Sequence, residues 1–341
     1  MSNKLITFMV PCYNSETYMS RCIDSLLTAG ERAEILIVDD GSTDRTGKIA
    51  VLYQKRYQEI CRVLTQENGG HGAGINHGLK EARRRYFKVV DSDDWLDEAA
   101  LIQFIAQLEN LEISGGVDQM VTNYVYDDID PSLTHTIRYR NVFPQGRIFV
   151  WDETRRFLPW QYLCMHVTTY RTQLLRDCGI HLPEHTFYED NLFAYLPLKK
   201  VRRLAYLNVD LYHYSIGRKD QSVEENMLKK NCEHQILVST RIFQSCDPKD
   251  LKMEEPRLAD YLWHALVFFL ILAIVFTRLN NSSEADQMVQ NMWVALKKEN
   301  KQLARKLRFR SLALFVSFPG AVGRRFAILC YRIAHKFVAF N

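Results

Sequence analysis

The stretch Lys88-Val89-Val90-Asp91-Ser92-Asp93-Asp94-Trp95-Leu96 places three carboxylates directly after a short apolar run. Carboxylates this close together repel one another, so a positive charge is expected near them. A divalent cation that bridges a diphosphate would supply it, because hard cations prefer oxygen ligands. The alternative is an acidic turn at the end of a strand.

Three earlier apolar runs also end in polar loops. The runs are residues 5–10, 34–38 and 62–65, and the loops that follow them are residues 11–16, 39–44 and 66–74. A helical pattern follows each loop, which predicts a mostly parallel α/β sheet with both faces covered. Ligands of such sheets bind at the carboxyl ends of the strands, where all four polar loops fall.

The four loops carry ordered motifs. They are Pro11-Cys12-Tyr13-Asn14, Val38-Asp39-Asp40-Gly41-Ser42-Thr43-Asp44, Asn68-Gly69-Gly70-x-Gly72 with Asn76-His77-Gly78, and Asp91-Ser92-Asp93-Asp94. In order and spacing they resemble the family 2 glycosyltransferases, which have the GT-A fold, a Rossmann-like and mostly parallel sheet flanked by helices. The sequence departs from the family at Ala73-Gly74-Ile75, where an Ala-Arg pair is common, and so lacks an arginine for the diphosphate.

The resemblance implies a pocket for a nucleotide-sugar donor, most simply a UDP-sugar. Pro11, Tyr13 and Glu16 would line the nucleoside. Asp39 or Asp40 would read the base, since a carboxylate accepts from the imide N–H of uracil. Tyr13 is equally compatible with an ordinary loop aromatic.

The glycine loop is expected to lie on the donor as well. Gly69 and Gly70 permit close backbone approach and positive φ angles. These glycines would also suit a structural turn, but the flanking Asn68 favours a ligand.

The acidic cluster and a later histidine are predicted to form a metal site. The resemblance assigns Asp91 and Ser92 to the donor, and Asp93 to Mn²⁺ or Mg²⁺. Asp94 supports the site or caps a helix. His213 lies in an alternating run, residues 210–214, and is either a further metal ligand or a buried histidine.

Two adjacent acids, Glu189 and Asp190, precede an apolar helix. On sequence alone they could simply favour the positive end of the helix dipole. The resemblance makes Asp190 the catalytic base, with Glu189 as the alternate base or the residue that orients it. Arg218 or Lys219, in the basic loop that follows residue 214, would close over the diphosphate.

Composition is that of a globular protein, with 47% hydrophobic and 25% charged residues. Eight cysteines without metal-binding spacing predict reduced, structural thiols.

We expect no signal peptide, because residues 1–4 lead directly into a strand. The 16-residue apolar segment 261–276 is shorter than a bilayer span and is expected to be a buried helix.

The net charge of +4 hides a basic tail. Residues 297–341 hold 11 Lys and Arg against one Glu, which is +10 and leaves −6 for the rest. On a helix, Phe326, Leu329, Cys330, Ile333 and Phe337 share one face beside a stripe of Arg325, Arg332 and Lys336. This pattern is typical of a helix on an anionic membrane or of an oligomerisation helix. We expect no nucleic-acid partner, because no reader motif accompanies the charge.

These patterns predict a GT-A catalytic domain at residues 1–215 and a helical region at 216–341. Within them, residues 151–158 and 284–308 are expected to be helices and residues 165–170 a strand. The expected activity is metal-dependent, inverting transfer of a sugar from a UDP-sugar to a carbohydrate or lipid-linked glycan, in the cytoplasm or on the inner face of the cell membrane. Two alternatives are a nucleotidyltransferase and a non-catalytic partner that binds nucleotide-sugar or glycan. The first would require arginine and lysine in the first loop, and residues 11–16 have neither.

Overall fold

The computed structural model describes residues 5–217 and 224–338, except 246, 248, 250, 251 and 253, with side chains as far as residue 333. The chain forms two compact units. The first comprises residues 1–155 and 163–216, and the second comprises residues 156–162 and 217–341. The arrangement of the two units relative to each other is not determined.

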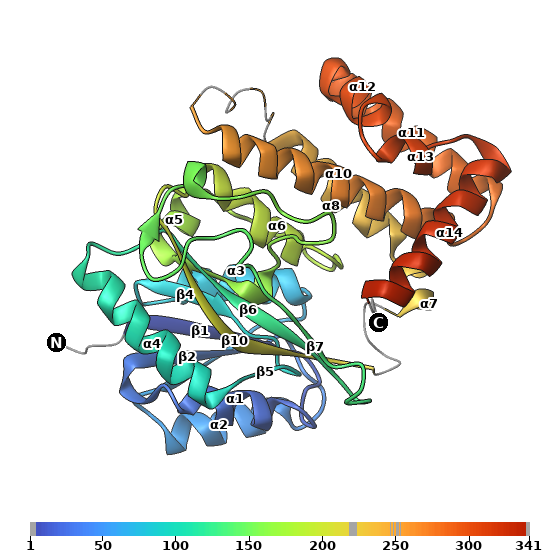
Figure 1. The fold of residues 1–341 in the computed structure, drawn as a ribbon. Helices are drawn as coiled ribbons and strands as arrows, with labels where there is room; N and C mark the ends of the chain where they lie inside the picture. Colours follow the sequence, from blue (N-terminus) through green and yellow to red (C-terminus); the bar gives the residue numbers. More distant parts are fainter. Residues whose placement is uncertain are drawn as a thin grey trace. The chain divides into compact units, whose positions relative to one another are not determined.

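One mixed sheet forms the centre of the first unit (Figure 1). Its strands are β1 (Ile6–Cys12), β2 (Ala33–Asp39), β3 (Cys61–Thr65), β4 (Tyr86–Val89), β5 (Trp95–Leu96), β6 (Gln119–Asp128), β7 (His135–Ile137), β8 (Ile148–Phe149), β9 (Thr168–Arg171) and β10 (Leu204–Ile216). The order is β3-β2-β1-β4-β9-β6-β10-β5, with β7 on β6 and β8 on β10. Strands β3, β2, β1 and β4 are parallel, as are β6 and β10, whereas β9 is antiparallel to both neighbours.

Helices cover both faces of this sheet (Figure 1). They are α1 (Met19–Leu27), α2 (Thr46–Arg56), α3 (His71–Glu81), α4 (Glu98–Ile113), α5 (Thr172–Asp177) and α6 (Asp190–Tyr195). Helices α1, α2 and α4 lie on one side, and α3, α5 and α6 on the other. Every residue of β1 and β2 is therefore buried, which is why these strands read as continuous apolar runs.

The order of the strands in the sheet reverses between β1 and β4. The chain moves outward from β1 through β2 to β3 and then returns to the far side of β1 as β4. The carboxyl ends of β1 and β4 thus flank a topological switch point, the usual place for a ligand in such sheets. The Asp91 stretch follows β4 directly.

The structure contradicts some predicted elements. Only the short 3₁₀ turn η2 (Trp151–Glu153) forms where a helix was expected over residues 151–158, and residues 156–162 group with the second unit. The expected strand over residues 165–170 begins as a 3₁₀ turn, η3 (Met165–Val167). The expected helix 284–308 is two helices, because the Asn300 side chain accepts the Leu303 N–H at 3.0 Å and caps the second one.

From residue 224 onward, the described part of the second unit is mainly helical. It contains α7 (Glu225–Lys230), α8 (Cys232–Ser245), α10 (Pro256–Arg278), α11 (Ser283–Glu299), α12 (Lys301–Phe309), α13 (Ala313–Val316) and α14 (Gly320–Val338). Helix α10 is long and apolar enough to cross a membrane by length and composition. However, 61% of its most apolar stretch is buried inside the protein, against α8, α11, α13 and α14, as in a core helix.

Candidate active site

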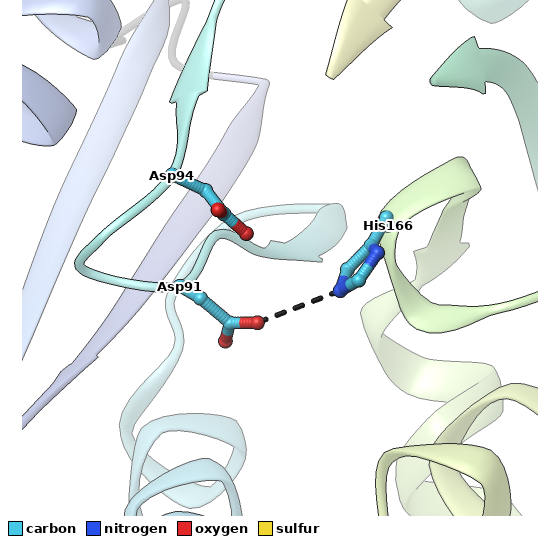
Figure 2. A group of neighbouring side chains, drawn as sticks. All are labelled: Asp91, Asp94 and His166. Carbon is cyan, nitrogen blue, oxygen red and sulfur yellow. Dashed lines mark ion pairs between the residues drawn. The ribbon is translucent and has the colours of Figure 1, made fainter. Parts of the chain in front are cut away.

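Three side chains that could ligate a metal meet at the carboxyl end of β4 (Figure 2). They are Asp91, which follows β4, Asp94, which precedes β5, and His166, which lies in η3. One potential ligand atom from each lies within 4.8 Å of the others. His166 faces Asp91, with its Nε2 atom 3.5 Å from Asp91 Oδ2.

Strand β10 holds this group in place. The Tyr212 hydroxyl donates to Asp94 Oδ2 at 2.5 Å and accepts the Asp91 N–H at 3.2 Å. The Ser215 N–H donates to the other oxygen of Asp94 at 2.9 Å. The His166 ring stacks on Tyr212 with 4.6 Å between ring centroids. The cluster is therefore built by elements that are far apart in the sequence.

The cluster concentrates negative charge in a buried place. Burial, reinforced by the nearby carboxylates of Asp93 and Asp91, raises the pKa of Asp94 well above its usual range. A cation would relieve this repulsion. Two carboxylates and an imidazole suit Mn²⁺, which accepts nitrogen as well as oxygen ligands, and the oxygens also suit Mg²⁺. The residues present therefore fit a divalent cation.

His71, at the start of α3, joins this cluster to a second pair of acids. Its Nε2 atom lies 2.9 Å from Asp91 Oδ1, and its Nδ1 atom lies 2.6 Å from Glu189 Oε1. Burial opposes protonation of the ring, but the two carboxylates outweigh burial and hold the pKa of His71 well above its usual range. One imidazole thus connects the end of β4 with the start of α6.

Asp190, beside Glu189, has a different environment. Burial, together with the adjacent Glu189 charge, raises the pKa of Asp190 to about 6. Its Oδ1 atom accepts a 3.3 Å hydrogen bond from Asn191. Tyr188, just before this pair, has a φ of +68°, a strained value for a side chain of this size. A carboxyl group with this pKa is mostly ionised at neutral pH and still accepts a proton readily.

The glycine loop is tied to β2 and to the segment before α6. The Asp40 carboxylate accepts the N–H groups of Gly69 at 2.9 Å and Gly70 at 2.8 Å. Gly70 has a φ of +84°, and a Cβ atom there would lie 2.9 Å from the His185 nitrogen. Only glycine fits this position without strain. Asp40 therefore fixes the loop, while its role in reading a base stays a prediction.

Comparison with known proteins agrees with this geometry. Residues 7–174 match the model of glycosyl transferase family 2. This part of the chain belongs to glycosyl transferase family 2. One relative of the family 2 domain is the uncharacterized glycosyltransferase EpsJ of Bacillus subtilis, 32% identical over 224 residues. That match covers 62% of this chain and 60% of EpsJ, so the match spans less than two thirds of that relative.

Solved structures show the fold of the family 2 domain. TarS 1–349 of Staphylococcus aureus, crystallised with UDP-GlcNAc, superposes with a TM-score of 0.60 and 20% identity over 97% of this chain and 92% of that chain. The mannosyltransferase PcManGT of Pyrobaculum calidifontis, in complex with GDP-Man and Mn²⁺, gives 0.55 and 14% over 98% and 87%. The predicted GT-A fold is confirmed.

The remaining residues predicted to bind the donor lie around the end of β1 and after β2. Pro11 belongs to β1, and Tyr13 is 53% exposed just after it. The Ser92 hydroxyl lies 2.8 Å from that of Ser15, which joins this loop to the acidic cluster. Glu16 Oε2 accepts the Arg45 N–H at 2.9 Å.

Other residues predicted to bind the donor follow β2. Asp39 Oδ1 accepts the Ser42 N–H at 3.1 Å, and Asn68 donates to the Asp40 carbonyl at 3.0 Å. The predicted donor residues of the described chain thus gather at the switch point, whereas Arg218 lies outside the described residues.

The two metal ligands predicted from the sequence are not in the Asp91, Asp94 and His166 group. For His213 the reason is strand geometry, because neighbouring residues on a strand point to opposite faces. Tyr212 faces Asp94, so His213 faces away, where its ring stacks on Trp95 at 3.8 Å. We therefore correct the ligand prediction from His213 to His166, while the metal role of Asp93 stays a prediction.

The sequence patterns did not identify four residues of this site, which are His71, His166, Tyr212 and Lys88. Lys88 is fully buried in β4, where its Nζ atom donates to the His166 carbonyl at 2.6 Å. Burial lowers the pKa of Lys88 to about 7. A lysine inside a predicted buried strand is itself a signal, since an unpaired ammonium is costly to bury. Lys88 fixes the backbone that carries His166.

Proposed function

We propose that this protein is a metal-dependent, inverting glycosyltransferase, with its catalytic domain in residues 1–215. It moves a sugar from a UDP-sugar to a carbohydrate or lipid-linked glycan in the cytoplasm. The observation that carries this proposal is the His71 bridge, because it places the acidic cluster and the Glu189–Asp190 pair in one site. TarS supports the donor, since its structure was determined with UDP-GlcNAc.

Asp190 acts as the base in this proposal. It removes the proton of an acceptor hydroxyl while that oxygen forms a bond to the anomeric carbon. The bond from the anomeric carbon to the diphosphate breaks, and its electron pair leaves with the nucleotide. The hydroxyl attacks from the face opposite the diphosphate, so the configuration of the anomeric carbon inverts.

The other residues position the reactants. Glu189, held by His71, orients the helix start that carries Asp190. Asp91, Asp94 and His166 would hold the cation, and their two carboxylates and one imidazole fit Mn²⁺ better than Mg²⁺. When bound, the cation neutralises charge on the leaving diphosphate. PcManGT, whose solved structure is a complex with GDP-Man and Mn²⁺, supports this assignment.

Nucleotide release tests the proposal. We expect UDP to be released from a UDP-sugar when a glycan acceptor and Mn²⁺ are present, and we expect chelation to abolish release until Mn²⁺ is restored. UDP-, GDP- and dTDP-sugars should be compared with several acceptors. Donor binding without release under every condition would instead identify a non-catalytic partner. Release of pyrophosphate from a nucleoside triphosphate and a sugar phosphate would identify a nucleotidyltransferase.

A further inference from the structure

Large apolar side chains gather on the surface of the second unit between residues 309 and 333. Seven of the twenty exposed large apolar side chains of the described residues fall in this stretch of 25 residues. They are Phe309, Leu312, Phe315, Phe318, Val322, Leu329 and Ile333. Scattered exposed apolar residues need no explanation, but a concentration of this kind marks an interaction surface.

Helix α14 shows how this surface is held outward. On its inner side, Ala327 is fully buried and Arg324 pairs with Asp286. Gly323 packs so closely that a Cβ atom there would collide with the Phe318 carbonyl. The Phe326 ring lies 6.0 Å from that of Phe315. The orientation of α14 within its unit is therefore fixed by packing, and its opposite side must face outward.

The outward side carries an apolar ridge and a basic stripe. Val322, Leu329 and Ile333 are 70%, 53% and 49% exposed, and helical geometry puts them within about 40° of one another. Arg325 and Arg332 are also exposed and lie within about 20° of each other, beside that ridge. Phe326 lies within about 20° of Ile333 on the same side of the helix and is half-buried against Phe315. The side chains of Lys336 and Phe337 lie outside those described.

The charge on the outward side of α14 distinguishes between two possible binding partners, a second copy of the chain and a lipid surface. No Asp or Glu occurs after Glu299, while α12 and the residue after it also expose Arg305, Lys306 and Arg310. A second copy placed on the same face would bring like charges together, which opposes association. An anionic lipid surface would neutralise the arginines with its headgroups and accept the apolar ridge between its acyl chains.

We propose that the surface formed by residues 309–333 docks the protein on an anionic membrane. The inference does not depend on turnover, because it concerns the second unit alone. It goes beyond the proposed activity by naming the surface that would hold the enzyme at a membrane.

Vesicle flotation of the full chain tests the proposal. We expect the protein to float with vesicles of phosphatidylcholine and phosphatidylglycerol but not with phosphatidylcholine alone, and we expect high salt to release it. Arg325→Gln with Arg332→Gln should lower binding about 25-fold, since each basic residue near such a surface is worth roughly fivefold. Leu329→Ser with Ile333→Ser should lower binding about tenfold or more.

Matched variants on the first unit serve as controls. Leu52→Ser and Lys55→Gln change exposed residues of α2 and should leave binding unchanged. Because all substituted side chains are exposed, thermal unfolding should be the same for every variant. Failure to float with either vesicle would overturn the proposal, as would equal binding by the α14 variants. A dimer in sedimentation analysis that Leu329→Ser abolishes would overturn it in favour of self-association.

Discussion

Asp94 and Glu189 are acidic residues buried inside the first unit, whereas Phe309, Leu312 and Val322 are apolar residues exposed on the second. The two regions depart from the usual distribution in opposite directions. In the first, hydroxyl, amide and imidazole groups surround the carboxylates, and a cation would complete the set. In the second, apolar side chains lie beside arginines with no acid nearby in the sequence. In each region the neighbouring side chains therefore indicate what would bind there. Polar ligands around the carboxylates indicate a cation, and arginines beside the apolar side chains indicate an anionic apolar surface.

The strongest test of the first region is the base. Asp190→Asn should lower kcat by about 10²–10⁴-fold, because the acceptor hydroxyl loses its proton acceptor. Donor affinity, measured by calorimetry, should not change. Asp177→Asn alters an exposed acid of α5 and is the matched control. Full activity of the Asp190→Asn variant would show that Asp190 is not the catalytic base.

Two histidines sharpen the metal assignment. His166→Ala should weaken Mn²⁺ binding by about 10–100-fold, whereas His213→Ala should leave it unchanged, because the two rings lie on opposite faces of β10. Mn²⁺ titration followed by electron paramagnetic resonance measures both. Thermal unfolding should accompany it, since His213 stacks on Trp95. A larger loss in the His213 variant would reverse the correction.

The His71 bridge can be cut at either end. His71→Asn keeps a donor near the Nδ1 position facing Glu189, and His71→Gln keeps one near the Nε2 position facing Asp91. We expect His71→Asn to raise the donor KM and His71→Gln to lower kcat, each about tenfold, the scale of one charge-assisted hydrogen bond. Steady-state kinetics separate these effects. If both variants shift the same parameter, the bridge does not divide into a donor side and a base side.

The smallest expected effect is on pH dependence. Burial and Glu189 raise the pKa of Asp190 to about 6, so the ionised, active form falls as pH decreases through that value. At saturating donor, kcat should be about half its plateau near pH 6 and should approach the plateau above pH 7. A flat profile between pH 5 and 7.5 would show that this carboxyl does not limit turnover.

The sheet could be predicted because each buried strand shows itself as an apolar run within its own few residues. Residues 6–10 and 35–38 are apolar without interruption, and both faces of β1 and β2 are covered. The polar loops follow these runs at the same edge, so the donor residues could be placed together. The positions of the donor residues were thus predicted from the order of strands and loops, without knowledge of side-chain contacts.

The ligand set could not be predicted because it depends on pairing between distant segments. His71 and Glu189 are 118 positions apart, as are Asp94 and Tyr212. A strand pattern cannot show which of two neighbouring residues faces a site, so His213 was chosen where Tyr212 and His166 meet Asp94. His71 lies within the predicted glycine loop, but the sequence does not show that it pairs with Asp91 and Glu189.

Strand β9 has a consequence for how the protein is made. It has only four residues, yet among the described strands it alone connects β3-β2-β1-β4 to β6-β10-β5. His166 lies in the turn just before it. A nascent chain that has emerged only as far as residue 160 therefore has neither a joined sheet nor its imidazole ligand. The turn that would supply the imidazole ligand and the strand that joins the two parts of the sheet therefore emerge together, ahead of β10.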